Sequence, residues 1–275
     1  MAGKGTPPPR LPSTKLPYPP RSPMLKVHIF PDKVQSGAAA AARGASLIRQ
    51  ALQNYGTANI VVATAPSQNE MYDALVAEKD LDWGKVNIFH LDEYIGLDDH
   101  HPASFRFNLH KTFLDRLPSP PMAFHPVQGE NPNPQEVCDA LEREIGSLRL
   151  DVAFIGIGEN GHIAFNDPPA DFDTKRSYLP VQLDEVCRHQ QFAEGWFPTM
   201  EDVPKVAISM SVPQIFRAKA IINTVPDARK AAAVAAAVEG PVTNLCPASI
   251  LQTHPDCHLY LDAPAASQLK GSYQE

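Results

Sequence analysis

The sequence predicts an α/β protein: a Rossmann-like, mostly parallel sheet with helices on both faces, in a single domain. Short apolar runs of strand length recur along the chain, and segments with helical periodicity lie between them. The run from Val152 to Ile157 is apolar throughout, as in strands that are buried on both faces of a parallel sheet. The chain has 275 residues, of which 43% are hydrophobic, so it is long enough to bury one large core.

The first 23 residues differ in composition from the rest of the chain. They contain eight prolines and four basic residues but no acidic residue. Such a segment has too little apolar surface to pack, so residues 1–23 are predicted to be a disordered Pro-rich tail, either inert or a ligand for a partner. Residues 24–275 are predicted to form the domain.

The elements expected within the domain alternate along the chain. Strands are expected at residues 25–30, 59–64, 86–91, 152–157, 205–210, 220–225 and 257–261. Helices are expected at 37–53, 70–78, 104–114, 136–148, 184–191 and 227–238, and a Pro-rich connection at 117–134. Strands that alternate with helices form right-handed βαβ units, which give a mostly parallel sheet.

Composition excludes several classes of function. The net charge of −7 argues against nucleic-acid binding, which needs a basic surface. The four cysteines are scattered without a C-x-x-C pair, which is typical of reduced thiols in a cytosolic protein. No apolar stretch approaches the ~20 residues of a membrane span, and the N-terminus lacks the apolar core of a signal peptide. The predicted location is therefore the cytoplasm, without a membrane partner.

The stretch from Asp151 to Pro169 is the strongest candidate for a site. Glycines at 156, 158 and 161 end the apolar run, and Asn160, His162 and Asp167 lie in or just after the turn. In open α/β sheets, ligands bind at the carboxyl ends of the strands. The alternative is a tight turn whose polar residues only cap backbone groups.

Three further strand or helix ends carry polar residues. The turn from Thr64 to Gln68 leads from a strand into a helix and suits an anion; Ser67 would add a hydroxyl, but Pro66 removes a donor, so a helix cap is the alternative. Asp92 and Glu93 leave a buried strand, where one desolvated carboxylate can act as a general base; a surface acid pair is the alternative.

Lys230 and a run of acidic and His residues complete the candidates. Lys230 lies in the first turn of an Ala-rich helix, where a lysine is unfavourable for the helix. It is either placed to meet an anion or exposed at the surface. The run from Asp98 to His101 has no defined ligand spacing, so a solvated loop is expected there in place of a metal site.

Three segments together resemble the glucosamine-6-phosphate deaminase family. Leu91–Gly96, followed by His101–Ser104, is similar to the family's D-E-Y-x-G … H-P-x-S segment. Gly158–Pro168 is similar to its G-x-D-G-H-I-A-F-N-E-P loop, and Lys230–Gly240 to its K-A-x-A-x-x-x-A-V-E-G helix. The resemblance extends from about Leu25 to the C-terminus. The sister family, 6-phosphogluconolactonase, shares the fold, but Tyr94 and the Ile163–Asn166 continuation favour the deaminases.

The resemblance implies an enzyme of amino-sugar metabolism that uses neither a metal nor a cofactor and acts on a small sugar phosphate. It would open the pyranose ring, move a proton between C2 and C1, and release ammonia. Asp92 would be the base, His162 would act in ring opening, and Asp167 would orient the imidazole. The resemblance further implies a homo-oligomer. The implied phosphate- and substrate-binding residues are Thr64, Ser67, Lys230, Arg188 and Glu93.

The chain departs from the family pattern at four places. Asn160 stands where the family has a catalytic Asp, and Asp167 where it has Glu. Ala65-Pro66-Ser67 replaces a Gly-rich phosphate loop, and the phosphate-binding arginine falls near Gln191, with Arg188 close enough in sequence to substitute. These departures leave two alternatives to a deaminase: a 6-phosphogluconolactonase-type lactone hydrolase, and a non-catalytic sugar-phosphate-binding protein.

Overall fold

The computed structural model of the protein describes residues 25–273, so the predicted tail at 1–23 lies outside the described residues. The strands are β1 (Leu25–Phe30), β2 (Ala58–Val62), β3 (Val86–His90), β4 (Asp92–Tyr94), β5 (Ala123–His125), β6 (Val152–Ile155), β7 (Tyr178–Gln182), β8 (Val206–Met210), β9 (Ala220–Val225) and β10 (Cys257–Asp262). The α-helices are α1 (Lys33–Tyr55), α2 (Asn69–Ala77), α3 (Phe105–Thr112), α4 (Pro134–Ile145), α5 (Glu185–Ala193), α6 (Val212–Ile215) and α7 (Ala231–Glu239). Short 3₁₀ helices are η1 (Pro66–Gln68), η2 (Trp83–Lys85), η3 (Leu114–Arg116), η4 (Ala228–Lys230) and η5 (Pro247–Thr253).

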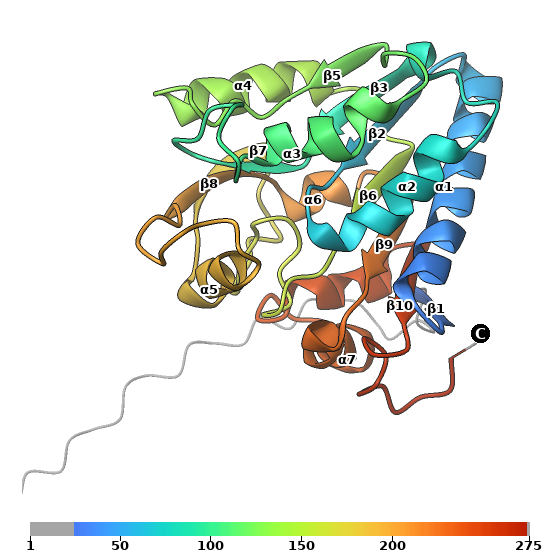
Figure 1. Cartoon of the computed structure of the whole chain (residues 1–275), viewed down its shortest axis with the longest axis vertical. Coiled ribbons are helices and arrows are strands. Elements are labelled where there is room, and N and C mark those ends of the chain that lie inside the picture. The colour runs from blue at the N-terminus through green and yellow to red at the C-terminus, as the bar shows by residue number, and fades with distance from the viewer. Residues whose placement is uncertain (1–24, 274–275) are drawn as a thin grey trace, which may run out of the picture.

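The main sheet has seven strands in the order β1-β10-β9-β6-β2-β3-β5 (Figure 1). Every neighbouring pair in it is parallel. β6 lies in the middle of the order, between β9 and β2. The carboxyl ends of β9, β6, β2 and β3 therefore meet at one edge, where polar residues were expected from the sequence.

Helices cover both faces of this sheet, as predicted. On one face, α1 and α2 lie side by side and bury alanines, Ile48, Met71 and Leu75 against β2, β3 and β6. On the other face, α4 and α7 pack Val137, Leu141 and alanines against the opposite sides of the strands. The α/β fold with a mostly parallel sheet is confirmed.

A second sheet corrects one expectation. β8 was expected in the parallel sheet, but it pairs antiparallel with β4 and β7 in a three-stranded sheet of order β4-β8-β7. Within this small sheet Asp92 is paired with Ser209. The small sheet therefore fixes the backbone of Asp92–Tyr94 just beyond the carboxyl end of β3.

Local sequence explains several element ends. Asp32 precedes α1, and its carboxylate accepts a hydrogen bond from the Gln35 N–H at 2.9 Å. Gly56 ends this helix with φ of 75°, a conformation that glycine adopts without strain. Ser104 precedes α3 and accepts from the Phe107 N–H at 3.2 Å. The predicted helix at 227–238 is divided, because η4 precedes α7.

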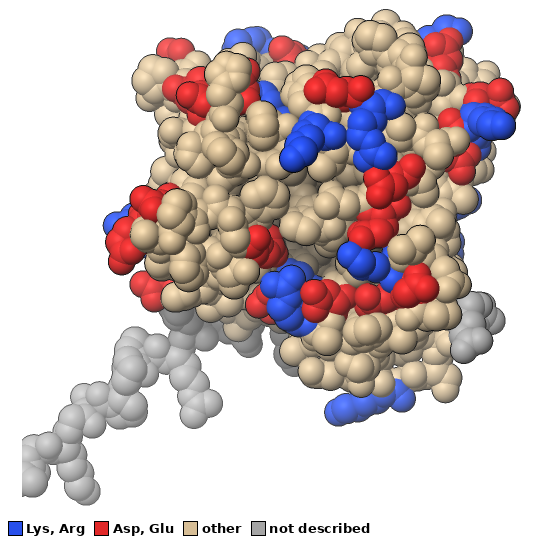
Figure 2. Space-filling model, viewed as in Figure 1, with Lys and Arg blue, Asp and Glu red and all other residues tan. Residues whose placement is uncertain are grey.

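The surface charges and the helices of the described residues bear on what the composition predicts. Figure 2 shows basic and acidic side chains interspersed on this face of the molecule. Within residues 25–273, no helix is both long and apolar enough to cross a membrane.

Candidate active site

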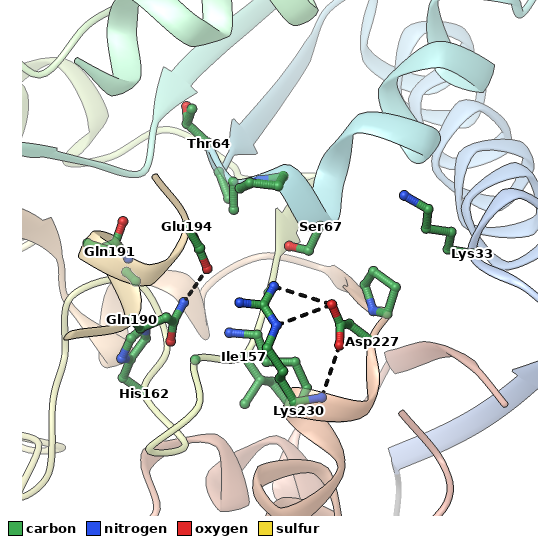
Figure 3. A pocket seen from close by; sticks show the side chains of 18 of the residues that line it. Lys33, Thr64, Ser67, Ile157, His162, Gln190, Gln191, Glu194, Asp227 and Lys230 are labelled. Atoms are coloured by element: carbon green, nitrogen blue, oxygen red, sulfur yellow. Dashed lines mark hydrogen bonds and ion pairs between the residues drawn. The ribbon is translucent and has the colours of Figure 1, made fainter. Parts of the chain in front are cut away.

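A cavity of about 440 Å³ lies where the main strands end, a size within the usual range of small-molecule sites. Its lining comes from the segments that follow β2, β3, β6 and β9, from the first turn of α1, and from α5 with the residue that follows it. Figure 3 shows labelled side chains from these segments facing one another. The lining residues with functional side chains are Lys33, Thr64, Ser67, Glu70, Asp92, His162, Gln190, Gln191, Glu194, Asp227, Arg229, Lys230 and Asp262.

Asp92 provides a buried carboxylate in the cavity wall. Its exposed fraction is only 5%. Burial raises the pKa of Asp92 well above its ordinary value, and the neighbouring Glu93 carboxylate raises it further. A carboxylate with a raised pKa is a stronger base than one in water, which suits proton abstraction near neutral pH.

Glu93 lies next to Asp92 in the chain but points away from the cavity. Its oxygens accept hydrogen bonds from the Ser104 hydroxyl at 2.8 Å and from the backbone N–H groups of Tyr94, Phe105 and Arg106. Burial raises the pKa of Glu93 to about 7, although these donors oppose the shift. Glu93, predicted to contact the substrate, does not line the cavity and instead joins β4 to the start of α3.

His162 and Asp167 form a pair in the Gly-rich loop that follows β6. His162 Nδ1 lies 3.1 Å from Asp167 Oδ1, although the N–H direction does not give a linear hydrogen bond. Burial raises the pKa of Asp167, but His162 and the Asn160 amide lower it to a net value below the ordinary one. The ionised Asp167 can therefore orient the imidazole, in spite of being one methylene shorter than the expected Glu.

Asn160 holds this pair in place. Its Nδ2 donates to Asp167 and to Asp184, both at 2.9 Å, and its Oδ1 accepts from the His162 N–H at 3.0 Å. Asn160 is absent from the cavity lining. Asn160 thus positions the His162–Asp167 pair through hydrogen bonds to both residues.

Ser67 and Lys230 lie on the other side of the cavity. The Gln68 amide donates to the Ile155 and Thr224 carbonyls and thereby fixes η1 against β6 and β9. Lys230 is only 5% exposed, and burial lowers the pKa of its ammonium. Across residues 25–273 the Lys230 ammonium forms no hydrogen bond or ion pair, so it has three donors to offer an anion.

Thr64 also reaches the cavity, at the end of β2. Its hydroxyl donates to the Phe105 carbonyl at 3.3 Å. That bond directs the hydroxyl toward α3, so Thr64 shapes the wall and joins two elements.

Arg188 does not reach the cavity, contrary to the expectation from the sequence. Its guanidinium donates to the Met200 and Val203 carbonyls, at 3.0 Å each. Gln191 does reach the cavity, where its Oε1 accepts from the Tyr94 hydroxyl at 2.7 Å. These bonds leave α5 without an arginine at the cavity.

Arg229 supplies a guanidinium that the sequence analysis missed. It lines the cavity next to Lys230, is 48% exposed, and lies 3.2 Å from Asp227 and 3.7 Å from Glu159. Its only signal in the sequence was adjacency to Lys230. The backbone of Asp227 has an unusual φ of 89°. Two hydrogen bonds hold it: the Asp227 N–H donates to the Asp262 carboxylate, and the Asp227 carboxylate accepts from Arg229.

Helix α5 and the residue after it add polar groups that were also missed. Gln190 accepts from the Glu159 N–H and donates to Glu194 at 2.9 Å. Glu194 also accepts from the Trp196 indole at 3.1 Å. Figure 3 shows Gln190 and Glu194 bonded to each other at the cavity edge, which places a carboxylate opposite the basic side.

Sequence comparison agrees with this geometry. The family model described as glucosamine-6-phosphate isomerases/6-phosphogluconolactonase matches residues 31–259. The chain belongs to this family.

Relatives within the family span nearly the whole chain. A glucosamine-6-phosphate deaminase from Streptococcus pneumoniae (strain Hungary19A-6) is 34% identical over 246 residues, which cover 90% of this chain and 100% of the relative. The solved structure of a monomeric glucosamine-6-phosphate deaminase matches with a TM-score of 0.81 at 29% identity, covering 88% of this chain and 99% of that chain. A putative 6-phosphogluconolactonase from Neisseria gonorrhoeae FA 1090 matches with a TM-score of 0.70 at 21% identity, covering 86% and 99%, and shows the shared fold.

The family motifs also contain residues that build the frame of the site. Tyr94 and Phe165 pack with ring centroids 5.2 Å apart in a satellite core. Asn166 donates to the Ile163 and Met210 carbonyls, each at 2.8 Å, and so joins the Gly-rich loop to β8. Tyr94, Phe165 and Asn166 have no role in proton transfer. Their contacts join the segment that carries Asp92 to the loop that carries His162.

The expected solvated loop at Asp98–His101 is confirmed. His100 has a side chain 90% exposed, and its backbone N–H donates to Asp98 at 2.9 Å.

Proposed function

We propose that the protein is a glucosamine-6-phosphate deaminase: an enzyme that converts an amino-sugar phosphate to a ketose phosphate and ammonia. The observation that carries this proposal is one cavity lined by a buried base (Asp92), an imidazole (His162) and an unpaired buried lysine (Lys230), with the Asp167 carboxylate 3.1 Å from the imidazole just outside the lining. This is the set of groups that an aldose–ketose proton transfer on a phosphorylated sugar requires.

The first step is ring opening. A pyranose opens when the ring oxygen gains a proton and the C1 hydroxyl loses one. An imidazole exchanges protons near neutrality, and the Asp167 carboxylate lies 3.1 Å from His162 Nδ1, where it can orient the ring. His162 is therefore assigned to this exchange.

The second step moves a proton from C2 to C1. Asp92 takes the C2 proton and returns it to C1, so the carboxylate ends as it began. The amine at C2 loses a proton and becomes an imine, and the C1 oxygen gains a proton and becomes a hydroxyl. One water molecule then hydrolyses the imine to a ketone and ammonia. A buried carboxylate with a raised pKa suits both halves of the transfer, because it is a strong enough base and a strong enough acid.

The phosphate lies, in this proposal, against Lys230, Ser67 and Arg229. Lys230 is unpaired, and Arg229 can form the two parallel hydrogen bonds that favour a guanidinium for phosphate. Arg229 replaces the arginine that the family pattern places near Gln191. The proposal extends to amino-sugar catabolism in the cytoplasm, with net hydrolysis of a C–N bond.

The test is ammonia release from glucosamine 6-phosphate by the purified full chain. We expect the wild-type protein to release ammonia. The Asp92→Asn variant should show a fall of at least ~10²-fold in kcat, the usual scale for a general acid–base group. Asp115→Asn serves as the control, because Asp115 is 69% exposed and outside the cavity. Circular dichroism of each variant checks its folding.

Two other outcomes would replace the proposal. Acid release from 6-phosphogluconolactone without ammonia release would assign the sister activity. Binding of the sugar phosphate without any turnover would indicate a sensor.

A further inference from the structure

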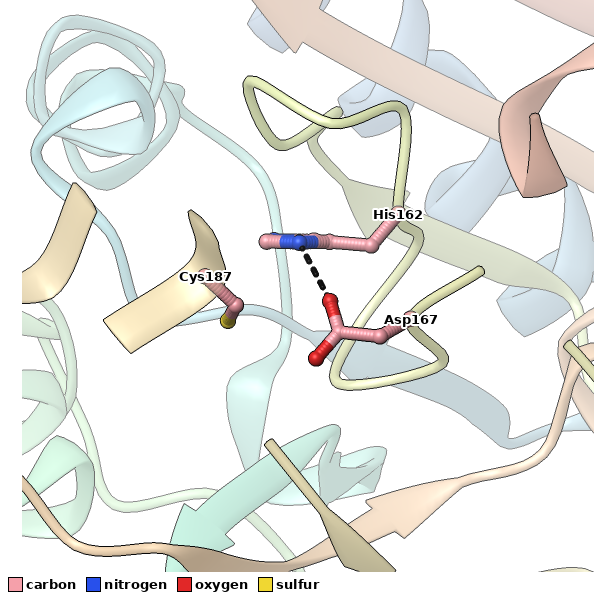
Figure 4. A group of neighbouring side chains, drawn as sticks. All are labelled: His162, Asp167 and Cys187. Carbon is pink, nitrogen blue, oxygen red and sulfur yellow. Dashed lines mark ion pairs between the residues drawn. The ribbon is translucent and has the colours of Figure 1, made fainter. Parts of the chain in front are cut away.

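Three side chains with metal-binding atoms lie close together beside the cavity. A ring nitrogen of His162, a carboxylate oxygen of Asp167 and the sulfur of Cys187 all lie within 4.8 Å of one another. Figure 4 shows them meeting between the Gly-rich loop and α5. In the described range 25–273, no other group of three His, Cys, Asp or Glu side chains is this close.

His162 and Cys187 are buried and Asp167 is half-buried, and one of the donor atoms has no hydrogen-bond partner. His162 is 7% exposed and Cys187 is 1% exposed. His162 Nδ1 is buried without a hydrogen-bond partner, although it faces Asp167 at 3.1 Å. A buried nitrogen left in this state costs free energy, and a ligand between the three side chains would remove that cost.

The donor set discriminates between cations. Nitrogen, oxygen and sulfur donors match Zn²⁺, which binds them tetrahedrally at about 2.0–2.3 Å. Ligand atoms around such an ion are about 3.3–3.8 Å apart, so the three side chains need to approach by only about 1 Å. One carboxylate and one thiolate also balance a charge of +2. Mg²⁺ and Ca²⁺ require oxygen ligands and fit poorly.

We propose that His162, Asp167 and Cys187 form a binding site for a thiophilic divalent cation, with Zn²⁺ as the fitting ion. His162 lines the main cavity and Asp167 lines a neighbouring cavity of about 380 Å³, so the ion has a route from either side. The thiol loses its proton to solvent when the metal–sulfur bond forms. Three protein ligands leave the fourth position to water.

Occupancy of this site has a consequence for activity. A cation that holds both His162 and Asp167 separates the pair that is assigned to ring opening. Zinc would therefore inhibit turnover reversibly. This consequence rests on the proposed function, whereas cation binding does not.

Cobalt(II) provides the direct test of binding. The metal-free full chain is titrated with CoCl₂, and the near-ultraviolet sulfur-to-cobalt charge-transfer band is followed with the visible bands of tetrahedral cobalt. We expect one equivalent to saturate the wild type. Loss of even an outer-shell partner weakens metal affinity by about 10–100-fold, so Cys187→Ser, which removes a ligand, should weaken binding by at least ~100-fold and abolish the band.

The matched control is Cys138→Ser, which removes another buried thiol from α4. It should keep the band. Zinc added to the wild-type enzyme should suppress ammonia release, and a chelator should restore it, whereas Cys187→Ser should keep its own zinc-free rate.

The results separate the two proposals. A cobalt spectrum without the charge-transfer band, or with the same band in Cys187→Ser, overturns the cation site. If Cys187→Ser does not fold, Asp167→Asn replaces it, and an unchanged cobalt affinity in that variant has the same meaning. The band without any ammonia release would keep the cation site and reject the deaminase.

Discussion

At the scale of single residues, the surroundings of Asn160 explain why an amide can stand where the family pattern has a carboxylate. The family pattern has Asp at this position, but here Asp184 lies within hydrogen-bond distance of the same side chain. The Asn160 amide donates to Asp167 and Asp184 at once, which a carboxylate cannot do. The substitution therefore fits its surroundings, and a third carboxylate would not.

This argument predicts the effect of restoring the family residue. Asn160→Asp should destabilise the protein at pH 7 by about 1–3 kcal/mol, because it removes two donors and adds a like charge. The pKa of Asp167 is now lowered by folding, so its contribution to stability is complete above its unfolded pKa and lost below its folded pKa. The deficit of the variant should therefore shrink as pH falls below about 4.

Thermal unfolding of wild type and variant between pH 3 and 8 measures this difference. Asn131→Asp is the control, because Asn131 lies outside both cavities. A deficit in Asn160→Asp that does not change with pH would contradict the charge argument.

Arg229 and Arg188 give a second prediction at this scale. Hydrogen bonds to charged groups contribute about 1.5–3 kcal/mol, so Arg229→Gln should raise KM for glucosamine 6-phosphate by about 10–100-fold. kcat should change little, because the phosphate is bound equally in the ground and transition states. Steady-state kinetics measure both constants.

The controls distinguish the two arginines. Arg116→Gln removes a guanidinium outside the cavity and should leave KM unchanged. Arg188→Gln removes bonds to the Met200 and Val203 carbonyls, so it should lower stability more than affinity. If Arg188→Gln alone raises KM, the phosphate assignment of Arg229 is wrong.

At the scale of elements, the sequence predicts long apolar segments well and short ones poorly. The strands at 25–30 and 220–225 have the expected bounds, because a proline, Pro31 or Pro226, directly follows each of them. β4 and β5 have three residues each, too few to show a period. β7 contains Pro180, which is tolerated because β7 is at the edge of its sheet.

The sequence likewise placed some residues of the candidate site at the cavity and failed to place others. Asp92, His162, Ser67 and Lys230 line one cavity as predicted, since each follows or begins an element whose end is set by the fold. Arg188 does not reach the cavity, because closeness in sequence to Gln191 does not give the direction of a side chain on a helix. Glu194 was missed because its place depends on how α5 packs against the main sheet.

The Gly-rich loop gives a prediction at the element scale. A Cβ on Gly158 would lie 2.1 Å from His162 Nε2, closer than any real contact, and the loop backbone would have to move. Gly158→Ala should therefore lower kcat by at least ~10²-fold, since small misplacement of a catalytic group costs that much. Ammonia release measures the effect.

Gly84→Ala is the matched control. Its Cβ would meet only the Asp82 carboxylate at 3.3 Å, outside the cavity. It should keep wild-type kcat. Normal turnover in Gly158→Ala would show that His162 does not act from its present position.

At the scale of the whole molecule, stability depends on close packing of the helical layers onto the sheet. α1 contacts β1, β2, β6, β9 and β10, and its buried face consists of alanines, glycines, Ser36 and Ile48. Small residues let a helix approach the strands closely. Phe154 of β6 fills the space above Gly44.

This contact predicts a stability change far from the site. A Cβ on Gly44 would lie 2.4–2.5 Å from the Phe154 ring, and overpacking of this kind costs about 1–3 kcal/mol, in spite of the higher helix propensity of alanine. Gly44→Ala should lower Tm by about 2–12 °C with little change in KM. Adding Phe154→Leu should make the combined loss smaller than the sum of the single losses by about 1 kcal/mol. Strictly additive losses would mean that α1 shifts as a body and that its contact with β6 does not limit stability.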